Sequence, residues 1–173
     1  CSSDLDLGTI PRVLDADALN LLAPLPGWWE KVKGPVILTP HPGEMARLCG
    51  LTTTEVQKNR LGLVRAKAAR WGVTLVLKGA ATLVGSNEEP IYINTTGNPA
   101  LATAGTGDVL AGMIGGFLAQ GLFPSQAAVI GVNLHGQAGD LAAAEIGAAG
   151  VLAGDLLPRI PQVMKEGQPS VNR

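Results

Sequence analysis

Short apolar runs alternate along this chain with segments of helical pattern, and this alternation limits its possible folds more than any other feature. Three runs are almost free of polar alternation and are predicted to be buried strands, at residues 12–15, 36–39 and 73–77. Residues 81–84 and 91–93, on either side of a polar segment, are predicted to form a hairpin. Buried strands that alternate with helices are typical of an α/β domain with a covered, mostly parallel sheet.

Helical patterns fill the intervals between the strands. One helix, capped by Thr52 or Thr53, is expected to open at residue 55 or 56, to run to about residue 70 and to end at Gly72. Further helices are predicted at residues 17–22, from about Gly43, at about 108–120, at about 125–142 and from near Asp155. The helices at 108–120 and 125–142 are nearly all apolar, so we expect them to be buried.

Polar residues follow several of the strand-like runs. Asp15, His41 and Lys78 come at or after the ends of the three buried runs, and a glycine loop precedes Asp108. In open parallel sheets, ligands bind in a crevice beyond the carboxyl ends of the strands. We therefore expect these four residues to face one crevice.

The loop Gly105-Thr106-Gly107-Asp108 is the sharpest candidate for chemistry. Its glycines leave backbone N–H groups uncovered, and the following helix adds unpaired N–H donors and the positive end of its dipole, which together favour an anion such as phosphate. Asp108, in the first helical turn, is predicted to act as general base, taking a proton from a substrate hydroxyl as that oxygen attacks a phosphoryl group. The alternative is an acid that only complements the helix dipole.

The segment K-G-A-A-T at residues 78–82 lies between two predicted strands. Lys78 is predicted to pair with a nucleotide phosphate while Gly79 lets the backbone approach the ligand. The alternative is a strand-end lysine that keeps its charge in solvent. The segment is not a Walker A loop, which requires G-x-x-x-x-G-K-[ST], so phosphate binding is expected to come from the Gly105 loop.

Three further residues have both a functional and a structural interpretation. His41, fixed between two prolines, is predicted to orient a substrate hydroxyl or a nicotinamide amide, whereas a lone histidine is more often structural. Glu44 is predicted to help hold Mg²⁺, partly through water, or else to be a first-turn acid or capping partner. His135, inside an apolar helix, is expected to be a hydrogen-bonded core residue rather than a ligand.

Composition restricts the class of protein. The 173 residues suffice for about one domain with a sizeable core. Thirteen basic and fourteen acidic residues form no basic stripe, so nucleic acid is not an expected partner. No run reaches the ~18 apolar residues of a membrane span, and no signal peptide is visible. The two cysteines make neither a disulfide framework nor a metal-ligand set, and a cytoplasmic location is expected.

Four motifs, in a characteristic order, carry a resemblance to a known family. They are V-L-D-A-D-A-L-N at 13–20, T-P-H-P-G-E at 39–44, L-K-G-A-A-T at 77–82 and G-N-P-A-L-A-T-A-G-T-G-D-V-L-A-G at 97–112. Together they closely resemble the ADP-dependent NAD(P)H-hydrate dehydratase family of the ribokinase-like superfamily. The G-T-G-D element alone indicates only the superfamily, whereas H-P-G-E and D-A-D-A-L-N narrow the match to the dehydratases. The resemblance implies a three-layer α/β/α fold.

The resemblance also concerns the extent of the domain. Family members carry a further α/β segment before D-A-D-A-L-N, and many bacterial members carry an N-terminal epimerase domain. The chain opens on Cys1 rather than Met. We therefore expect residues 1–173 to be one partial domain, the C-terminal portion of a longer protein. The family further implies a homo-oligomer.

The activity that the resemblance implies is repair of a damaged nicotinamide cofactor. The S epimer of hydrated NADH or NADPH is dehydrated at the expense of ADP in bacterial members and of ATP in eukaryotic ones. The added hydroxyl is phosphorylated, and loss of phosphate then restores the ring double bond. On this sequence the resemblance makes Asp108 the catalytic base and places it with His41 at the hydrated-cofactor site, and Glu44 becomes a Mg²⁺-associated acid. The implied nucleotide-binding residues are Lys78, Gly79, Ala80, Ala81, Thr82, Gly105, Thr106 and Gly107.

Two other functions stay open on the residues alone. A ribokinase-like small-molecule kinase, acting on a sugar or a hydroxymethylpyrimidine, would share the G-T-G-D loop, but H-P-G-E is not expected there. A catalytically inert nucleotide-binding module would keep the loop without completing the reaction.

Overall fold

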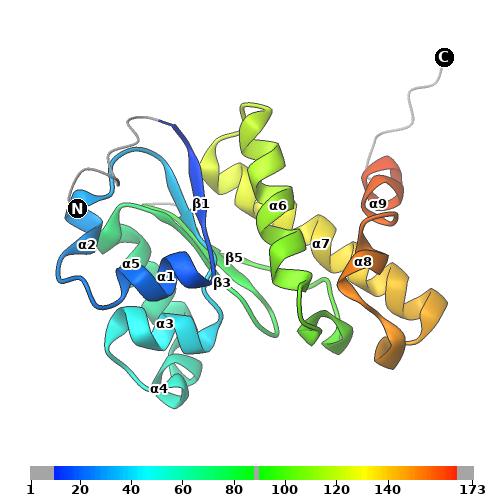
Figure 1. Cartoon of the computed structure of the whole chain (residues 1–173), viewed down its shortest axis with the longest axis horizontal. Helices are drawn as coiled ribbons and strands as arrows, with labels where there is room; N and C mark the ends of the chain where they lie inside the picture. The colour runs from blue at the N-terminus through cyan, green and yellow to red at the C-terminus, as the bar shows by residue number, and fades with distance from the viewer. Residues whose placement is uncertain (1–9, 88–89, 167–173) are drawn as a thin grey trace.

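Short strands form one mixed sheet in the computed structural model, which describes residues 10–87 and 90–166 (Figure 1). The strands lie side by side in chain order as β1 (Arg12–Leu14), β2 (Val36–Leu38), β3 (Thr74–Leu77), β4 (Leu83–Gly85) and β5 (Tyr92–Ile93). β1, β2 and β3 are parallel, and β4 is antiparallel to both of its neighbours, so β5 again runs in the direction of the first three. The three predicted strands and the hairpin are confirmed, with ends shifted by one or two residues.

Helices cover both faces of this sheet (Figure 1). One face carries α1 (Asp17–Leu22), α2 (Trp28–Lys31), α3 (Pro42–Cys49), α4 (Thr53–Lys58) and α5 (Arg60–Trp71). The other face carries the long helices α6 (Thr106–Ala119) and α7 (Pro124–Ile146), which pack against each other. The remaining short elements are the 3₁₀ helices η1 (Pro99–Ala102) and η2 (Ala148–Gly150) and the helices α8 (Ala153–Leu156) and α9 (Ile160–Glu166).

Successive strand residues point into two separate cores. Leu38 and Leu75 lie in the core between the sheet and the α1–α5 layer, whereas Ile37 and Val76 lie in the core against α6 and α7. All four side chains are fully buried, which stabilises the fold by about 2 kcal/mol each. Because neighbouring strand residues face opposite sides, apolar runs without polar alternation are what a sheet covered on both faces requires. The three-layer arrangement expected from the sequence is confirmed.

The Thr52 cap of the next predicted helix is confirmed, but the helix begins at Thr53 rather than at residue 55 or 56, and it is broken at Asn59. Asn59 has the non-helical angles φ −138° and ψ 44° and separates α4 from α5. Its side chain lies over the next turn, where a Cβ on Gly62 would come within 2.4 Å of Asn59 Oδ1. Glycine at position 62 therefore makes room for the break, and Arg60 becomes the first residue of α5.

The long helices are longer than predicted. α6 starts two residues early, at Thr106, because Gly105 adopts the left-handed angle φ 88° and turns the chain directly into the helix. α7 continues to Ile146, and the predicted helix near Asp155 is split into α8 and α9. Pro158, which has no backbone N–H, lies between these two short helices.

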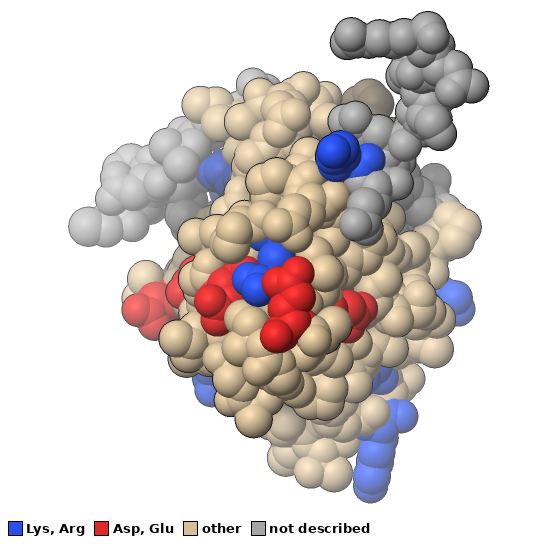
Figure 2. Space-filling view, turned by 90° about the vertical axis from the view of Figure 1, so that its right-hand side faces the viewer, with Lys and Arg blue, Asp and Glu red and all other residues tan. Residues whose placement is uncertain are grey.

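Arg159, between α8 and α9, links these helices to the end of α7 through hydrogen bonds. Its Nε and Nη2 donate to Glu145 Oε2 at 3.0 and 2.5 Å, and its Nη1 donates to the carbonyl oxygen of Asp155 at 2.6 Å. Figure 2 views the molecule from this side and shows acidic and basic side chains close together on a largely uncharged face. Across the described residues, every helix is too short or too polar to cross a membrane.

Candidate functional site

A cavity of about 670 Å³ lies where the loops that follow β2, β3 and β5 meet the first turn of α6. Its walls include His41, the whole 78–82 segment, parts of residues 94–103, Thr106 and Gly107, and side chains of α7. The carboxyl ends of β2 and β3 lead into it, which is the usual ligand position in an open α/β sheet. The expected crevice is therefore present, but of the four residues expected to face it, His41 and Lys78 line it and Asp15 and Asp108 do not.

The first turn of α6 forms one wall of this cavity. Thr106 is buried, and its hydroxyl lies 2.7 Å from the carbonyl oxygen of Leu101 and 2.9 Å from that of Thr103, which holds the loop against the helix. Asp108 lies in the first turn, as predicted, and directly follows Gly107. Its side chain is exposed and has no hydrogen-bond or ion-pair partner within residues 10–87 and 90–166. Asp108 itself does not line the cavity.

His135 supports this turn from α7. Its Nε2 lies 2.9 Å from the backbone carbonyl oxygen of Thr106, and because a carbonyl only accepts, the ring donates this hydrogen bond. The side chain is buried, and this burial lowers the pKa of His135 below its usual value. The prediction of a hydrogen-bonded core histidine is confirmed, although the residue also lines the cavity.

Lys78 lies in an ionic cluster with Asp15 and Glu44. Its Nζ donates to Asp15 Oδ1 at 2.7 Å and lies 4.0 Å from Glu44 Oε2. A Cβ on Gly107 would lie only 3.4 Å from the same Nζ, so the ammonium group stands beside the first turn of α6. The cluster thus brings the ends of β1 and β3 and the helices α3 and α6 together, and the charge of Lys78 is neutralised by carboxylates.

His41 and Glu44 form the N-terminal cap of α3. His41 Nδ1 accepts hydrogen bonds from the backbone N–H groups of Gly43 and Glu44, at 3.0 and 3.3 Å. Glu44 Oε2 accepts from the backbone N–H of His41 at 2.7 Å, which completes a capping box. Since Nδ1 accepts, the neutral ring carries its proton on Nε2, which lies 3.3 Å from Glu44 Oε1. Glu44 therefore has the alternative, capping role that the sequence allowed, and the roles of both residues toward a ligand stay predictions.

The protein groups near the cavity do not fit a Mg²⁺ site of their own. The part of the chain that the structure describes contains no cluster of three or more metal-ligating side chains. Both carboxylate oxygens of Glu44 already face donors, and Lys78 stands between Glu44 and Asp15. Mg²⁺ commonly keeps several waters and binds through substrate phosphates. A water-mediated contact from Glu44 to such an ion stays a prediction.

The segment after β5 forms a wall of the cavity. Residues 97–103 belong to the fourth motif, but their contacts with α7 were not predicted from the sequence. Asp140 of α7 accepts from the backbone N–H of Gly97 at 2.8 Å and from Asn98 Nδ2 at 2.9 Å. Gly136 lets this segment approach α7, because a Cβ there would overlap Thr96 Oγ1 at 2.0 Å. An acidic residue within a mostly apolar helical pattern was the one available hint, and its partners lie some forty positions away in the chain.

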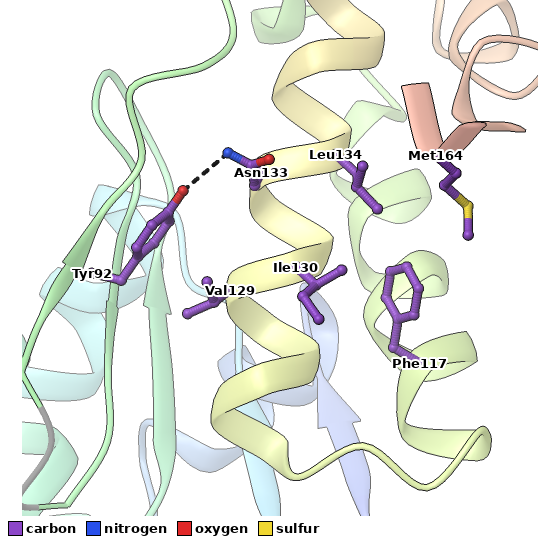
Figure 3. Close-up of a pocket in the computed structure, with 7 residues that line it drawn as sticks. All are labelled: Tyr92, Phe117, Val129, Ile130, Asn133, Leu134 and Met164. Carbon is purple, nitrogen blue, oxygen red and sulfur yellow. Dashed lines mark hydrogen bonds between the residues drawn. The ribbon is translucent and has the colours of Figure 1, made fainter. Parts of the chain in front are cut away.

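A second hollow, of about 420 Å³, lies on the outer side of α7 and differs in chemistry. Figure 3 shows the hydroxyl of Tyr92 directed at Asn133, whose Nδ2 donates to it at 3.1 Å. Phe117, Ile130 and Met164, from α6, α7 and α9, give the hollow an apolar lining. None of its lining residues carries a charge, so of these two cavities the larger one is better suited to acid–base or phosphate chemistry.

Comparisons with known proteins identify relatives of the chain. The chain is 49% identical over 156 residues to a bifunctional NAD(P)H-hydrate repair enzyme Nnr of Moorella thermoacetica, covering 90% of this chain and 29% of that protein. It is 50% identical over 151 residues to an ADP-dependent (S)-NAD(P)H-hydrate dehydratase of Neisseria meningitidis, covering 86% of this chain and 51% of that protein. The chain thus spans about half or less of the length of these relatives.

A solved structure shares the fold. The ADP/ATP-dependent NAD(P)H-hydrate dehydratase from Bacillus subtilis, co-crystallised with ATP/Mg²⁺, superimposes with a TM-score of 0.81 at 40% identity, covering 91% of this chain and 55% of that one. The ribokinase-like fold expected from the resemblance is confirmed. The model of the NAD(P)H-hydrate dehydratase family matches residues 7–162, which is most of the chain. The chain therefore belongs to the NAD(P)H-hydrate dehydratase family.

Proposed function

We propose that the protein to which this chain belongs dehydrates the S epimer of hydrated NADH or NADPH and converts ADP to AMP and phosphate. Family membership supports this reaction, as do the names of the relatives from Neisseria meningitidis and Bacillus subtilis. The use of ADP rather than ATP follows the Neisseria relative, whereas the Bacillus protein is described as dependent on either nucleotide.

One observation carries the proposal. Asp108 is exposed, is without a partner among the residues that the structure describes, and follows Gly107, which lines the cavity beside the 78–82 segment. A carboxylate free of donors can accept a proton, and a general base of this kind contributes roughly 10²–10⁴-fold to a rate. The open N–H groups of the α6 first turn provide the adjoining position for phosphate.

In the proposed first step, Asp108 takes the proton of the added hydroxyl group while the hydroxyl oxygen attacks the β-phosphorus of ADP. The bond from this phosphorus to the bridging oxygen breaks, and AMP leaves with the electron pair. In the second step the carbon–oxygen bond breaks and phosphate leaves. A proton lost from the neighbouring ring carbon restores the double bond. Phosphate is a far better leaving group than hydroxide, which is why the nucleotide is consumed.

The other proposed contacts follow the cavity walls. The 78–82 segment and residues 105–107 bind the nucleotide, and His41 contacts the hydrated nicotinamide from the opposite loop. Mg²⁺ is proposed to enter with the nucleotide phosphates, whose charge it neutralises. The family resemblance also supports a homo-oligomer in the cytoplasm, which light scattering and cell fractionation would check.

The test is recovery of reduced-nicotinamide absorbance from hydrated NADH. The full-length protein is incubated with Mg²⁺ and hydrated NADH, and with ADP, ATP or no nucleotide in parallel reactions. We expect recovery with ADP, release of AMP and phosphate in equal amounts, and none of these without nucleotide. Nucleotide binding without recovery would instead indicate an inert module, and a phosphorylated sugar or pyrimidine released from a substrate panel would indicate a kinase.

A further inference from the structure

Arg60, the first residue of α5, reaches across to the loop between β3 and β4. Its Nη2 donates to the carbonyl oxygens of Leu77 at 3.2 Å, Lys78 at 3.4 Å and Ala81 at 3.2 Å. Its Nη1 donates to the carbonyl oxygen of Ala80. One guanidinium group therefore binds four backbone carbonyls, one at the end of β3 and three in the following loop, and residues 78–82 of this loop line the cavity.

This arrangement sets the direction of the loop's N–H groups. In a planar trans peptide the carbonyl and the following N–H point in opposite directions. Because the carbonyls of residues 78, 80 and 81 point toward Arg60, the N–H groups of Gly79, Ala81 and Thr82 point away from it. Among the described residues none accepts a hydrogen bond from these three N–H groups. Residues 78–82 line the cavity and Arg60 does not, so the N–H groups that point away from Arg60 are available to a ligand in the cavity.

The loop needs such a support because its backbone is strained. Gly79 has φ 132° and Ala81 has φ 52°, an unfavourable left-handed angle for a residue with a side chain. A conformation of this kind costs about 1 kcal/mol or more and persists only where surrounding contacts hold it. A Cβ on residue 79 would lie 3.3 Å from Arg60 Nη2, so glycine also permits the close approach of the guanidinium.

Arg60 and Lys78 differ in the kind of group that accepts their hydrogen bonds. Lys78 is paired with Asp15, whereas within residues 10–87 and 90–166 Arg60 has only neutral carbonyls as partners, and its Nε is buried without an acceptor. A guanidinium stays charged at neutral pH. Its positive field therefore reaches the loop with no carboxylate partner among the described residues, and a phosphate on the cavity side would supply a negative charge.

We propose that Arg60 is a positioning residue for the nucleotide: it turns the N–H donors of the 78–82 loop toward the phosphates of a nucleoside diphosphate and supplies positive charge behind them. The identity of the nucleotide rests on the proposed function, whereas the loop geometry does not. Arg60 touches neither the reacting hydroxyl nor the proposed base, so its removal weakens nucleotide binding without affecting the chemical step.

The test compares Arg60→Gln and Arg60→Lys with Arg65→Gln in the full-length protein. Arg65 is exposed on the same helix and has no partner among the described residues, so it controls for loss of one positive charge. Calorimetric titration with ADP should show affinity lowered about tenfold or more in Arg60→Gln, the scale of losing hydrogen bonds from a charged group. Arg60→Lys, which keeps the charge but not the fork of donors, should be intermediate, and Arg65→Gln should be unchanged.

Kinetics separate positioning from general damage to the fold. In Arg60→Gln the KM for ADP should rise with the loss of affinity, while kcat at saturating ADP and the KM for hydrated NADH change less than about twofold. Equal ADP affinity in Arg60→Gln and Arg65→Gln would overturn the proposal, as would wild-type affinity in Arg60→Lys. If Arg60→Gln does not fold, the affinity of Arg60→Lys decides. A wild-type protein that binds ADP but restores no NADH refutes the proposed function, and the binding comparison still tests Arg60.

Discussion

Lys78 and Asp108 both lie next to Gly107, and they differ in whether their charge is paired. In the ionic cluster of Asp15, Glu44 and Lys78, the ammonium lies 2.7 Å from one carboxylate and 4.0 Å from the other, and all three side chains are less than a fifth exposed. Asp108, one residue beyond Gly107, is exposed and has no partner among the described residues.

The paired groups of the ionic cluster hold the site together, whereas the carboxylate of Asp108 can react. A charge removed from water is tolerable only when it is paired, and such a pair fixes the positions of the elements that supply it. A carboxylate that is to take a proton must instead be free of donors and open to a substrate. Asp108 meets this condition because it stays in water until a ligand covers it.

Replacement of the free carboxylate should have the largest effect. Asp108→Asn should lower kcat roughly a thousandfold, because the amide cannot accept the hydroxyl proton. The affinity for ADP should stay within a few-fold of wild type, since no paired charge is lost. Single-turnover kinetics and ADP titration calorimetry measure the two quantities. Near-normal turnover in this variant would show that Asp108 is not the base.

Loss of the ion pair between Lys78 and Asp15 should mainly lower the stability of the fold. Asp15→Asn leaves the ammonium of Lys78 without its 2.7 Å partner and should lower the free energy of unfolding by about 2 kcal/mol, less than for a fully buried pair because both side chains keep some exposure. Asp17→Asn is a matched control on the exposed start of α1 and should change stability by less than about 0.5 kcal/mol. Urea unfolding of both variants compares them, and equal midpoints would contradict a structural role for the cluster.

The turn that presents Asp108 can be tested with two glycines of the same helix region. Gly105→Ala should destabilise the protein by about 1 kcal/mol, because position 105 has φ 88° and the new Cβ would lie 3.1 Å from Ala153 Cβ. Gly112→Ala, at an open site inside α6, should stabilise it by about 0.5–1 kcal/mol. Thermal unfolding gives both values. An unchanged or raised stability of Gly105→Ala would mean that the left-handed turn at Gly105 does not constrain the start of α6.

The smallest expected effect is a pH dependence from His135, which supports the same turn. Burial lowers the pKa of this residue in the folded protein, so below about pH 6.5 the unfolded chain binds a proton that the folded chain resists. The free energy of unfolding should therefore fall as the pH drops from 7 toward 5.5. His135→Gln should show a shallower fall over this range, measured by urea unfolding at each pH. Parallel pH profiles would argue against a neutral buried His135.

The local sequence pattern was sufficient to predict most of the fold. The apolar runs that became β2 and β3 contain no polar alternation, and only a sheet covered on both faces buries such runs completely. The break at Asn59 was not predictable from periodicity, because the apolar pattern continues through it and the reason is the fit of a side chain over Gly62. The early start of α6 depended likewise on the φ angle that Gly105 adopts in three dimensions.

The candidate site, like the fold, was predictable from the sequence only in part. The motifs around His41, residues 78–82 and Gly107 predicted which loops line the cavity, because parallel strands deliver their carboxyl ends to one edge. The partners of those loops were not predictable. Lys78 was expected to face a phosphate and is paired with Asp15, and Arg60 and Asp140 hold loop carbonyls and N–H groups far away in the chain.

The sequence by itself determined the α/β class, the order of the strands along the chain, the family, and the turn that carries Asp108, since each depends on residues close together in the chain. Only the tertiary structure decided that Lys78 is paired, whereas Asp108 has no partner among the described residues. That outcome depends on distances between side chains of β1, β3, α3 and α6, and no local pattern encodes it. The glycine loop and its carboxylate were visible as a motif, whereas the solvent exposure of Asp108 beside a neutralised lysine was not.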